Sequence, residues 1–200
     1  MRVLVVGASG TIGSEVVAAL GDRHEVVSAS RSHGDVRVDL TSRSSIDAMY
    51  EEIGDVDAVV CAAGEAAFGP LAELSDDDFE LSLRSKLMGQ VNLVRSGVGH
   101  VRDGGSFTLT TGILAAEPTG GCGAVSLVNA GLEGFVRAAA LELPRGLRVN
   151  AVSPPWVAET LEAMGRSPAA GLRAAVVGRA YVACVEGARQ GRIVDARDFA

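Results

Sequence analysis

This sequence has few aromatic residues, few cysteines and a single lysine. Aromatic residues make up 4% of its 200 residues, so alanine, valine and leucine must form most of the core. The three cysteines, Cys61, Cys122 and Cys184, are far apart and odd in number, which fits neither a disulfide framework nor a zinc-binding spacing. The three histidines form no metal-ligand pattern either. We therefore expect reduced thiols and no metal site.

Positive charge and long apolar runs are also scarce. The formal net charge is −7, which argues against a nucleic-acid-binding surface. No apolar run looks long enough to span a membrane, so we expect no membrane partner. The first residues already have the pattern of a buried strand, which leaves no room for a signal peptide. These features predict a cytoplasmic protein with one domain, residues 1–200.

The strongest positive signal lies near the N-terminus, where four apolar residues precede a glycine-rich turn and a helical pattern. Gly7 suits a tight turn, Gly10 lets the backbone approach a ligand, and Gly13 lets the helix lie close to the strand. The N–H groups at the helix start then face an anion, for which we expect a pyrophosphate. The alternative is an ordinary glycine-rich connection, but the strand–turn–helix context favours nucleotide binding.

Strand and helix patterns alternate along the whole chain, with no linker or repeat. Seven strands with right-handed crossovers predict an α/β, doubly wound Rossmann fold: a mostly parallel seven-stranded sheet with helices on both faces. Its ligand crevice lies at the carboxyl ends of the strands. The expected strands are residues 3–6, 25–29, 36–38, 57–61, 106–110, 147–152 and 192–194, and the expected helices are residues 12–20, 42–53, 75–101, 122–143 and 169–186.

Further motifs follow the predicted strands in a fixed order. Asp39-Leu40 follows the third strand, Cys61-Ala62-Ala63-Gly64 closes the fourth, and Arg148-Val149-Asn150-Ala151-Val152-Ser153-Pro154 contains the sixth. With the glycine turn, this order resembles the short-chain dehydrogenase/reductase family over nearly the whole chain. The motif at residues 148–154 is the most specific match, whereas the motif at residues 61–64 lacks both asparagines of the family's Asn-Asn-Ala-Gly. The resemblance implies a nicotinamide cofactor held by Gly7, Ser9, Gly10, Thr11, Ile12, Gly13, Asp39, Leu40, Ala62, Ala63, Gly64, Pro154 and Thr160.

The family's catalytic residues are not conserved in this chain. The family uses Tyr-x-x-x-Lys on its long helix and a serine thirteen residues before the tyrosine. In that frame, Val125 stands for the tyrosine, Asn129 for the lysine and Gly112 for the serine. Valine cannot transfer a proton, whereas Asn129 retains the ability to hydrogen-bond a ribose without supplying charge.

At Lys86 this chain gains an ionisable side chain, whereas at the three positions above it has lost the catalytic group. Aligning residues 87–89 with the family's pattern places this only lysine at its fourth catalytic position, an asparagine. We predict that Lys86 is the cation or acid at the substrate oxygen, because a buried lysine can lose its proton and an arginine cannot. The alternative is a solvated helix lysine. Thr111, Ser126 and Asn129 are further candidates for hydrogen bonding or proton transfer, although small polar residues near a cofactor are more often structural.

The second strand ends at Ser30-Arg31, where the adenosine ribose should lie. An acidic residue at this point would accept a hydrogen bond from a ribose 2′-hydroxyl, whereas arginine suits a 2′-phosphate and Ser30 adds a donor. The sequence therefore predicts NADP(H) in preference to NAD(H). The alternative is a surface arginine without a ligand.

Two functions remain open at this point. The first is an NADP(H)-dependent oxidoreductase that transfers hydride between carbonyl and alcohol groups of a small molecule, with an atypical proton-transfer site. The second is a non-catalytic NADP(H)-binding sensor or scaffold of the same fold, as the loss of the catalytic residues would allow. The resemblance also implies a homodimer or homotetramer, because the helices near residues 83–101 and 122–143 match the family's interface pair.

Overall fold

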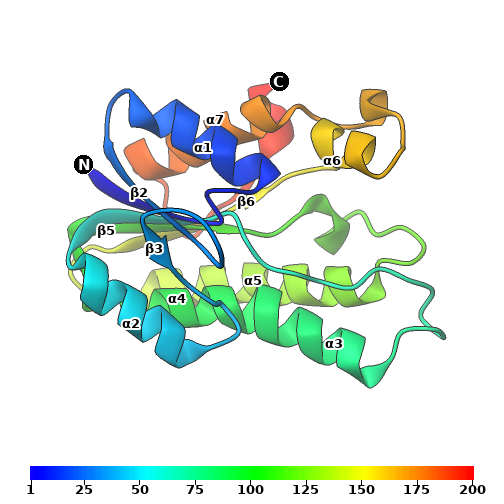
Figure 1. Ribbon diagram of the computed structural model, residues 1–200, viewed down its shortest axis with the longest axis horizontal. Helices are drawn as coiled ribbons and strands as arrows, with labels where there is room; N and C mark the ends of the chain where they lie inside the picture. The colour runs from blue at the N-terminus through cyan, green and yellow to red at the C-terminus, as the bar shows by residue number, and fades with distance from the viewer.

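The computed structural model describes all 200 residues and places a twisted sheet between two layers of helices (Figure 1). The strand order is β3-β2-β1-β4-β5-β6-β7, and all neighbouring strands are parallel, so the predicted doubly wound fold is confirmed. The strands are β1 (Arg2–Val6), β2 (Glu25–Ser30), β3 (Val36–Arg37), β4 (Val56–Cys61), β5 (Val101–Thr110), β6 (Arg148–Ser153) and β7 (Ile193–Asp195).

Figure 1 shows which helices cover which face of the sheet. On the upper face lie α1 (Thr11–Gly21), α6 (Ala158–Ala163) and α7 (Ala174–Glu186). On the lower face lie α2 (Arg43–Ile53), α3 (Asp76–Ser82), α4 (Gly89–Gly97) and α5 (Gly123–Glu142). Four short helical turns complete the chain: η1 (Leu83–Met88), η2 (Ile113–Ala115), η3 (Pro168–Ala170) and η4 (Ala196–Phe199).

The core lies on both faces of the sheet because side chains alternate along each strand. In β1, Val3 and Val5 pack into the upper cluster with residues of α1 and α7, whereas Leu4 and Val6 pack into the lower cluster. All four side chains are buried. This arrangement explains why β1 has a continuous apolar run and not an alternating pattern.

The long helix expected over residues 75–101 consists of three pieces. Ser75 begins α3 with a capping box, in which its hydroxyl accepts from the Asp78 N–H while the Asp78 carboxylate accepts from the Ser75 N–H. Between α3 and α4 the helix widens into the π-helical turn η1, where the Gly89 N–H donates to the Arg84 carbonyl. Such turns are rare and often mark functional positions. The single helix expected here is therefore interrupted by a turn of different geometry that contains Lys86.

The prediction of one helix over residues 169–186 was wrong in its first part. That helix, α7, begins only at Ala174, and α6 precedes it. Val157 and Leu172 form a parallel bridge, in which the Ala158 N–H donates to the Leu172 carbonyl and the Leu172 N–H donates to the Trp156 carbonyl. Because this bridge needs extended backbone at Leu172, a continuous helix cannot pass through it.

The expectation that no segment is long and apolar enough to cross a membrane also needs correction. By length and composition α5 meets that criterion, although an apolar helix in a protein core meets it too. In the structure α5 packs against the sheet, with Leu132 and Val136 fully buried in the lower cluster. We therefore assign α5 as a core helix of the domain.

Candidate cofactor and active site

Two cavities lie next to each other at the carboxyl ends of the strands. The first cavity has a volume of about 380 Å³ and the second about 360 Å³, and Gly64 and Glu65 line both. The first cavity is lined by Ile12, Gly64, Glu65, Ala66, Phe68, Lys86, Thr110, Thr111, Gly112, Ile113, Leu114, Val125, Asn129, Pro154, Pro155, Trp156, Val157 and Thr160. The second is lined by Val6, Gly7, Ser9, Gly10, Ser30, Arg31, Ser32, Val38, Asp39, Leu40, Thr41, Ala62, Ala63, Gly64, Glu65 and Ser85.

The glycine turn after β1 approaches other backbone too closely to accept side chains. A Cβ atom on Gly13 would lie 1.9 Å from the Gly7 carbonyl oxygen, and one on Gly7 would lie 2.7 Å from the Ala62 carbonyl oxygen. Gly7 also has a φ of +85°, a conformation that favours glycine. No acidic residue occupies the first turn of α1. The positive end of this helix is therefore available to an anion.

Three polar side chains of the second cavity, those of Asp39, Ser30 and Arg31, are bonded to neighbouring protein groups. The Asp39 carboxylate accepts from the N–H and the hydroxyl of Thr41, which lowers the pKa of Asp39 below its usual value. The Ser30 hydroxyl bonds to the backbone of His33, so the donor expected at this position is already used. The exposed Arg31 guanidinium forms an ion pair with Glu65 across the cavity entrance.

Lys86 is held in the first cavity by the bonds of its neighbours. The Ser85 hydroxyl accepts from the Glu65 N–H at 3.0 Å, which ties η1 to the loop after β4. The buried Gln90 carboxamide donates to the carbonyls of Lys86 and Thr110 and accepts from the Thr110 N–H at 2.8 Å. These contacts fix the helix against β5. A Cβ atom on Gly64 would lie 2.9 Å from the Lys86 Cα, so only glycine lets this loop pass Lys86 so closely.

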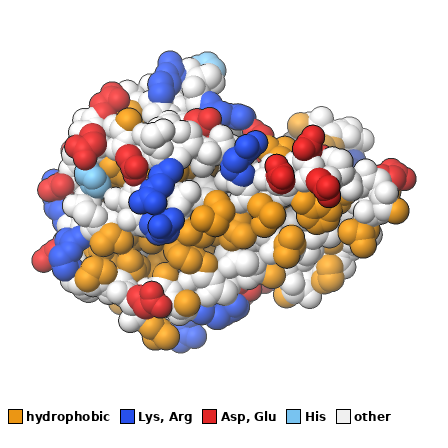
Figure 2. All heavy atoms as spheres, turned by 90° about the horizontal axis from the view of Figure 1, so that it is seen from below, with side chains coloured by type: hydrophobic (Ala, Val, Ile, Leu, Met, Phe, Trp, Pro, Cys, Tyr) orange, Lys and Arg blue, Asp and Glu red, His pale blue; other side chains and the backbone are white.

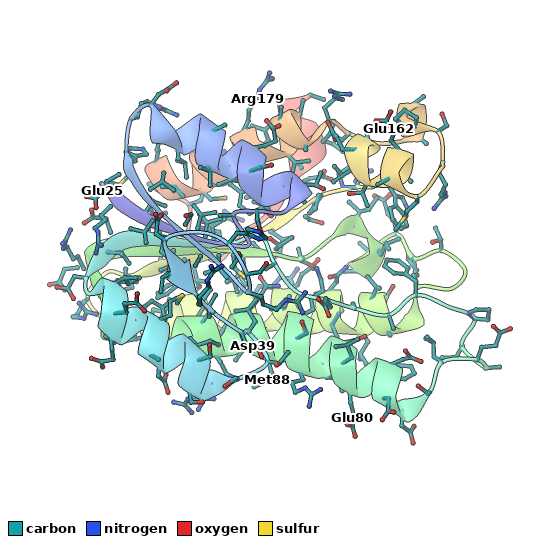
Figure 3. All side chains as sticks on the ribbon, in the orientation of Figure 1. Glu25, Asp39, Glu80, Met88, Glu162 and Arg179 are labelled. Atoms are coloured by element: carbon teal, nitrogen blue, oxygen red, sulfur yellow. The ribbon has the colours of Figure 1, made fainter.

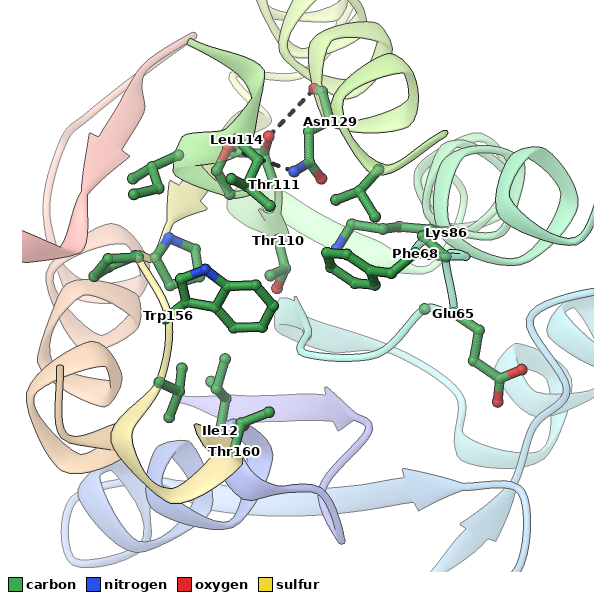
Figure 4. A pocket seen from close by; sticks show the side chains of 18 residues that line it. Ile12, Glu65, Phe68, Lys86, Thr110, Thr111, Leu114, Asn129, Trp156 and Thr160 are labelled. Atoms are coloured by element: carbon green, nitrogen blue, oxygen red, sulfur yellow. Dashed lines mark hydrogen bonds between the residues drawn. The ribbon is translucent and has the colours of Figure 1, made fainter. Parts of the chain in front are cut away.

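The ammonium of Lys86 extends into the first cavity (Figure 4) and has no hydrogen-bond or ion-pair partner in the protein. Burial lowers the pKa of Lys86 to about 8. Asn129, from α5, lies in the same cavity, and its amide donates only a long 3.5 Å contact to the Gly112 carbonyl. Its Oδ1 is buried without a partner. Two polar atoms of the cavity are therefore free to contact a ligand.

The hydroxyl groups near Lys86 are mostly committed. Thr110 donates to the Cys61 carbonyl and so accepts from the buried Tyr181 hydroxyl. Thr111 donates to the Asn129 carbonyl at 3.2 Å. Ser126 donates to the Leu114 carbonyl at 2.6 Å and does not line the cavity, so the structure does not bring this predicted residue to the site.

Aromatic side chains that the sequence analysis did not select form one side of the first cavity. Phe68, from the loop after β4, and Trp156, from the loop after β6, have ring centroids 5.5 Å apart (Figure 4). The Arg166 guanidinium lies 5.3 Å from the centroid of the Trp156 ring. The same reasoning that selected the only lysine could have selected Trp156, because it is the only tryptophan of the chain.

The remaining predicted residues divide between the cavities. The first contains Lys86, Thr111, Asn129, Ile12, Pro154 and Thr160, whereas the second contains Gly7, Ser9, Gly10, Ser30, Arg31, Asp39, Leu40, Ala62 and Ala63, and Gly64 lies between them. Thr11 and Gly13 line neither cavity, because Thr11 is exposed at the start of α1 and Gly13 is buried against the turn.

Comparison with known proteins finds a reductase family model and relatives that are named as reductases or dehydrogenases. A family model described as enoyl-(acyl carrier protein) reductase matches residues 1–188. Hydroxynaphthalene reductase arp2 of Aspergillus fumigatus is 30% identical over 142 residues, which are 66% of this chain and 52% of that protein. The chain thus spans about half the length of this curated relative.

Two solved structures match almost the entire chain. The protein lin1944 from Listeria innocua is 42% identical, with a TM-score of 0.93, and the match covers 98% of each chain. A small-chain dehydrogenase in complex with NADPH is 25% identical, with a TM-score of 0.86, and the match covers 98% of this chain and 95% of that one.

Proposed function

Because this chain belongs to the short-chain dehydrogenase/reductase family, we propose that it is an NADP(H)-dependent oxidoreductase that interconverts a carbonyl and an alcohol group, with Lys86 at the substrate oxygen. The observation that carries this proposal is the position of Lys86. The residue lies in a π-helical turn, and its ammonium extends into the first cavity without a protein partner. A half-buried cation in that position can stabilise charge on a reacting oxygen.

The residues present fit a dinucleotide. The glycine turn leaves no room for a Cβ atom at Gly13, and the positive end of α1 suits a pyrophosphate. The second cavity provides space for the adenosine half, and the adjacent first cavity provides space for the nicotinamide on its Ile12 and Thr160 side, next to a substrate on its Lys86 side. The unpartnered Oδ1 of Asn129 can accept a hydrogen bond from a ribose hydroxyl. When bound, the nicotinamide supplies or takes the hydride, and the protein positions the substrate.

The preference for NADP(H) rests on Arg31. Relatives include an NADPH complex and proteins named as NAD-dependent, so the choice must come from the residues of this chain. A guanidinium at the end of β2 suits a 2′-phosphate. Glu65, which pairs with Arg31, competes with that phosphate. We infer that the 2′-phosphate of bound NADP(H) replaces Glu65 as the ion-pair partner of Arg31.

In the reduction direction, Lys86 acts as the acid. Its ammonium donates a hydrogen bond to the carbonyl oxygen and transfers one proton from Nζ to it as the carbon is reduced. The neutral amine then regains a proton from solvent. Gln90 and Ser85 do not touch the substrate, but they keep the Lys86 backbone in position. A pKa of about 8 leaves this lysine mostly protonated at neutral pH and still able to release its proton.

A non-catalytic sensor or scaffold is the competing function. Val125, Asn129 and Gly112 line the first cavity at the positions of the family's tyrosine, lysine and serine, and this loss of the usual acid favours it. The two functions differ in whether bound NADPH is consumed.

A turnover assay distinguishes them. Oxidation of NADPH is followed by its absorbance against a panel of aryl and alkyl ketones, with wild-type protein and with Lys86→Met. We expect at least one substrate with wild-type protein and almost none with the variant. Tight NADPH binding without turnover on any carbonyl would favour the sensor, and equal turnover by Lys86→Met would remove Lys86 from the mechanism.

We also propose that the protein forms a homodimer or homotetramer in the cytoplasm. Figure 2 shows a band of hydrophobic side chains on the lower helical face, where Leu127 and Leu141 of α5 are 50% and 88% exposed. Met88 points away from the sheet on this face, opposite Arg179 on the upper face (Figure 3). A second copy would cover this band. All three cysteines are buried and unpaired, which suits a reducing compartment.

A further inference from the structure

The first cavity combines apolar, partly aromatic walls with a single unpaired cation. Phe68 and Trp156 meet on one side, and Ile12, Val125 and Val157 supply aliphatic wall (Figure 4). Aromatic rings favour contact with flat conjugated rings through offset stacking and edge-to-face packing. The chemistry of the wall therefore suits a flat ring system.

The charge of the cavity is positive. Glu65 is the only acidic residue in its lining, and its carboxylate turns away from the cavity toward Arg31 (Figure 4). Lys86 is thus partly desolvated without a nearby carboxylate. A half-buried cation without a counter-ion carries a desolvation cost, and an anionic ligand group would offset it.

Few hydroxyl groups remain for a polyhydroxylated ligand. The hydroxyls of Thr110 and Thr111 donate to protein carbonyls, and Ser126 is bonded outside the cavity, so the Thr160 hydroxyl is the one in the lining without a protein partner. The wall offers a sugar or polyol only the Lys86 ammonium, the Asn129 side chain and the Thr160 hydroxyl in exchange for its many bonds to water. The cavity therefore suits a ligand with few hydroxyl groups better than a carbohydrate.

We propose that the first cavity takes a flat, conjugated ring ligand with an ionised oxygen, with the ring against Phe68 and Trp156 and the oxygen on the Lys86 ammonium. This inference rests on the proposed function, in which such a ligand is the substrate. An ammonium has three donors, so Lys86 can contact the ionised oxygen and an adjacent carbonyl oxygen together. A ring whose phenolate or enolate oxygen neighbours the reducible carbonyl satisfies both contacts.

Three matched probes test the proposal by calorimetric titration. They are 2-naphthoate, which is flat and anionic; 2-naphthamide, which is flat and neutral; and decahydro-2-naphthoate, which is anionic and not flat. We expect 2-naphthoate to bind about tenfold or more tightly than either of the others. Equal binding of 2-naphthamide would overturn the requirement for an anion, and equal binding of the decahydro compound would overturn the requirement for a flat ring.

Variants then locate the two contacts. Lys86→Met should remove the preference for 2-naphthoate over 2-naphthamide, whereas Arg95→Met, an exposed cation on α4, should retain it. Trp156→Leu should reduce the preference for the flat anion, and Trp156→Phe should restore most of it. Circular dichroism checks that each variant is folded. A preference unchanged in Lys86→Met would refute the proposal.

The titrations are made without cofactor and then at saturating NADP⁺. Binding without cofactor does not depend on the proposed oxidoreductase function, so a protein that fails to bind NADP(H) still tests the cavity. We expect NADP⁺ to leave the affinity for 2-naphthoate within about threefold. If NADP⁺ abolishes 2-naphthoate binding, the anion occupies the place of the cofactor and the inferred substrate site is wrong.

Discussion

The two cavities at the carboxyl edge differ in how their polar side chains are satisfied. In the second cavity Asp39 bonds to Thr41, Ser30 to His33 and Arg31 to Glu65. In the first cavity the Lys86 ammonium and the side-chain Oδ1 of Asn129 have no protein partner. A cavity that binds through backbone N–H groups can use its side chains for its own structure, whereas a reaction needs side chains that remain free for the ligand.

The largest effect on cofactor affinity should come from the glycine turn, where the cofactor is expected to bind backbone N–H groups. In Gly13→Val the new Cβ atom would lie 1.9 Å from the Gly7 carbonyl oxygen, so α1 must shift and its N–H groups leave the pyrophosphate. We expect NADPH affinity to fall by about 100-fold or more in calorimetry. Gly21→Val, at an open position on the same helix, is the control. Unchanged affinity in Gly13→Val would show that the turn is only structural.

Lys86→Met should separate binding from reaction. It removes the one cation of the first cavity, so we expect turnover to fall by about 100-fold or more while NADPH affinity stays within about threefold. Lys86→Arg retains the charge but cannot release a proton in this pH range, so it should also lose most turnover. A parallel loss of NADPH affinity would mean that Lys86 belongs to the cofactor site.

The pH profile of turnover should report on the same lysine. Lys86 is protonated below its pKa of about 8, so an acid in this position loses activity as the pH rises through that value. The buried Cys61 thiol, whose pKa is raised to about 11, does not titrate there, and Glu65 is paired with Arg31. Lys86→Arg should move the basic limb to higher pH. A limb at the same pH in that variant would point to another group.

Changes in the second cavity should alter selectivity by smaller amounts. Arg31→Ala should lower the affinity ratio of NADPH to NADH by about tenfold, the size of one charge-assisted contact. Glu65→Gln should raise that ratio severalfold, because it removes the carboxylate that competes with a 2′-phosphate. Calorimetric titration of both cofactors measures each ratio. A ratio that is the same in wild type and Arg31→Ala would refute the NADP(H) assignment.

Substitutions on the outer face of α5 should have the smallest effect on ligand binding in either cavity. Leu127→Asp puts a charge into the hydrophobic band, so sedimentation should show a smaller species than wild type at micromolar concentration. Cofactor affinity should stay within about twofold. Met164→Asp, an equally exposed position after α6, serves as the control. A wild-type protein that is already a monomer would contradict the proposed interface.

The sequence determined the fold, and it determined where most residues expected to hold a cofactor lie, because these depend on local patterns. A run of apolar residues followed by Gly7, Gly10 and Gly13 specifies strand, turn and helix within a few residues. Alternating strands and helices with right-handed crossovers then specify a doubly wound parallel sheet, whose strand order the structure gives. For this reason the residues expected around a cofactor lie almost entirely along the two cavities.

Only the tertiary structure decided which polar groups remain free. The sequence treats Ser30, Ser126 and Asn129 alike, yet the first two bond to nearby carbonyls and the third keeps a buried oxygen unpartnered. It also does not show that Phe68 and Trp156, 88 residues apart, meet at one cavity. Hydrogen-bond partners and ring contacts depend on segments that are distant in the chain, so local patterns do not encode them.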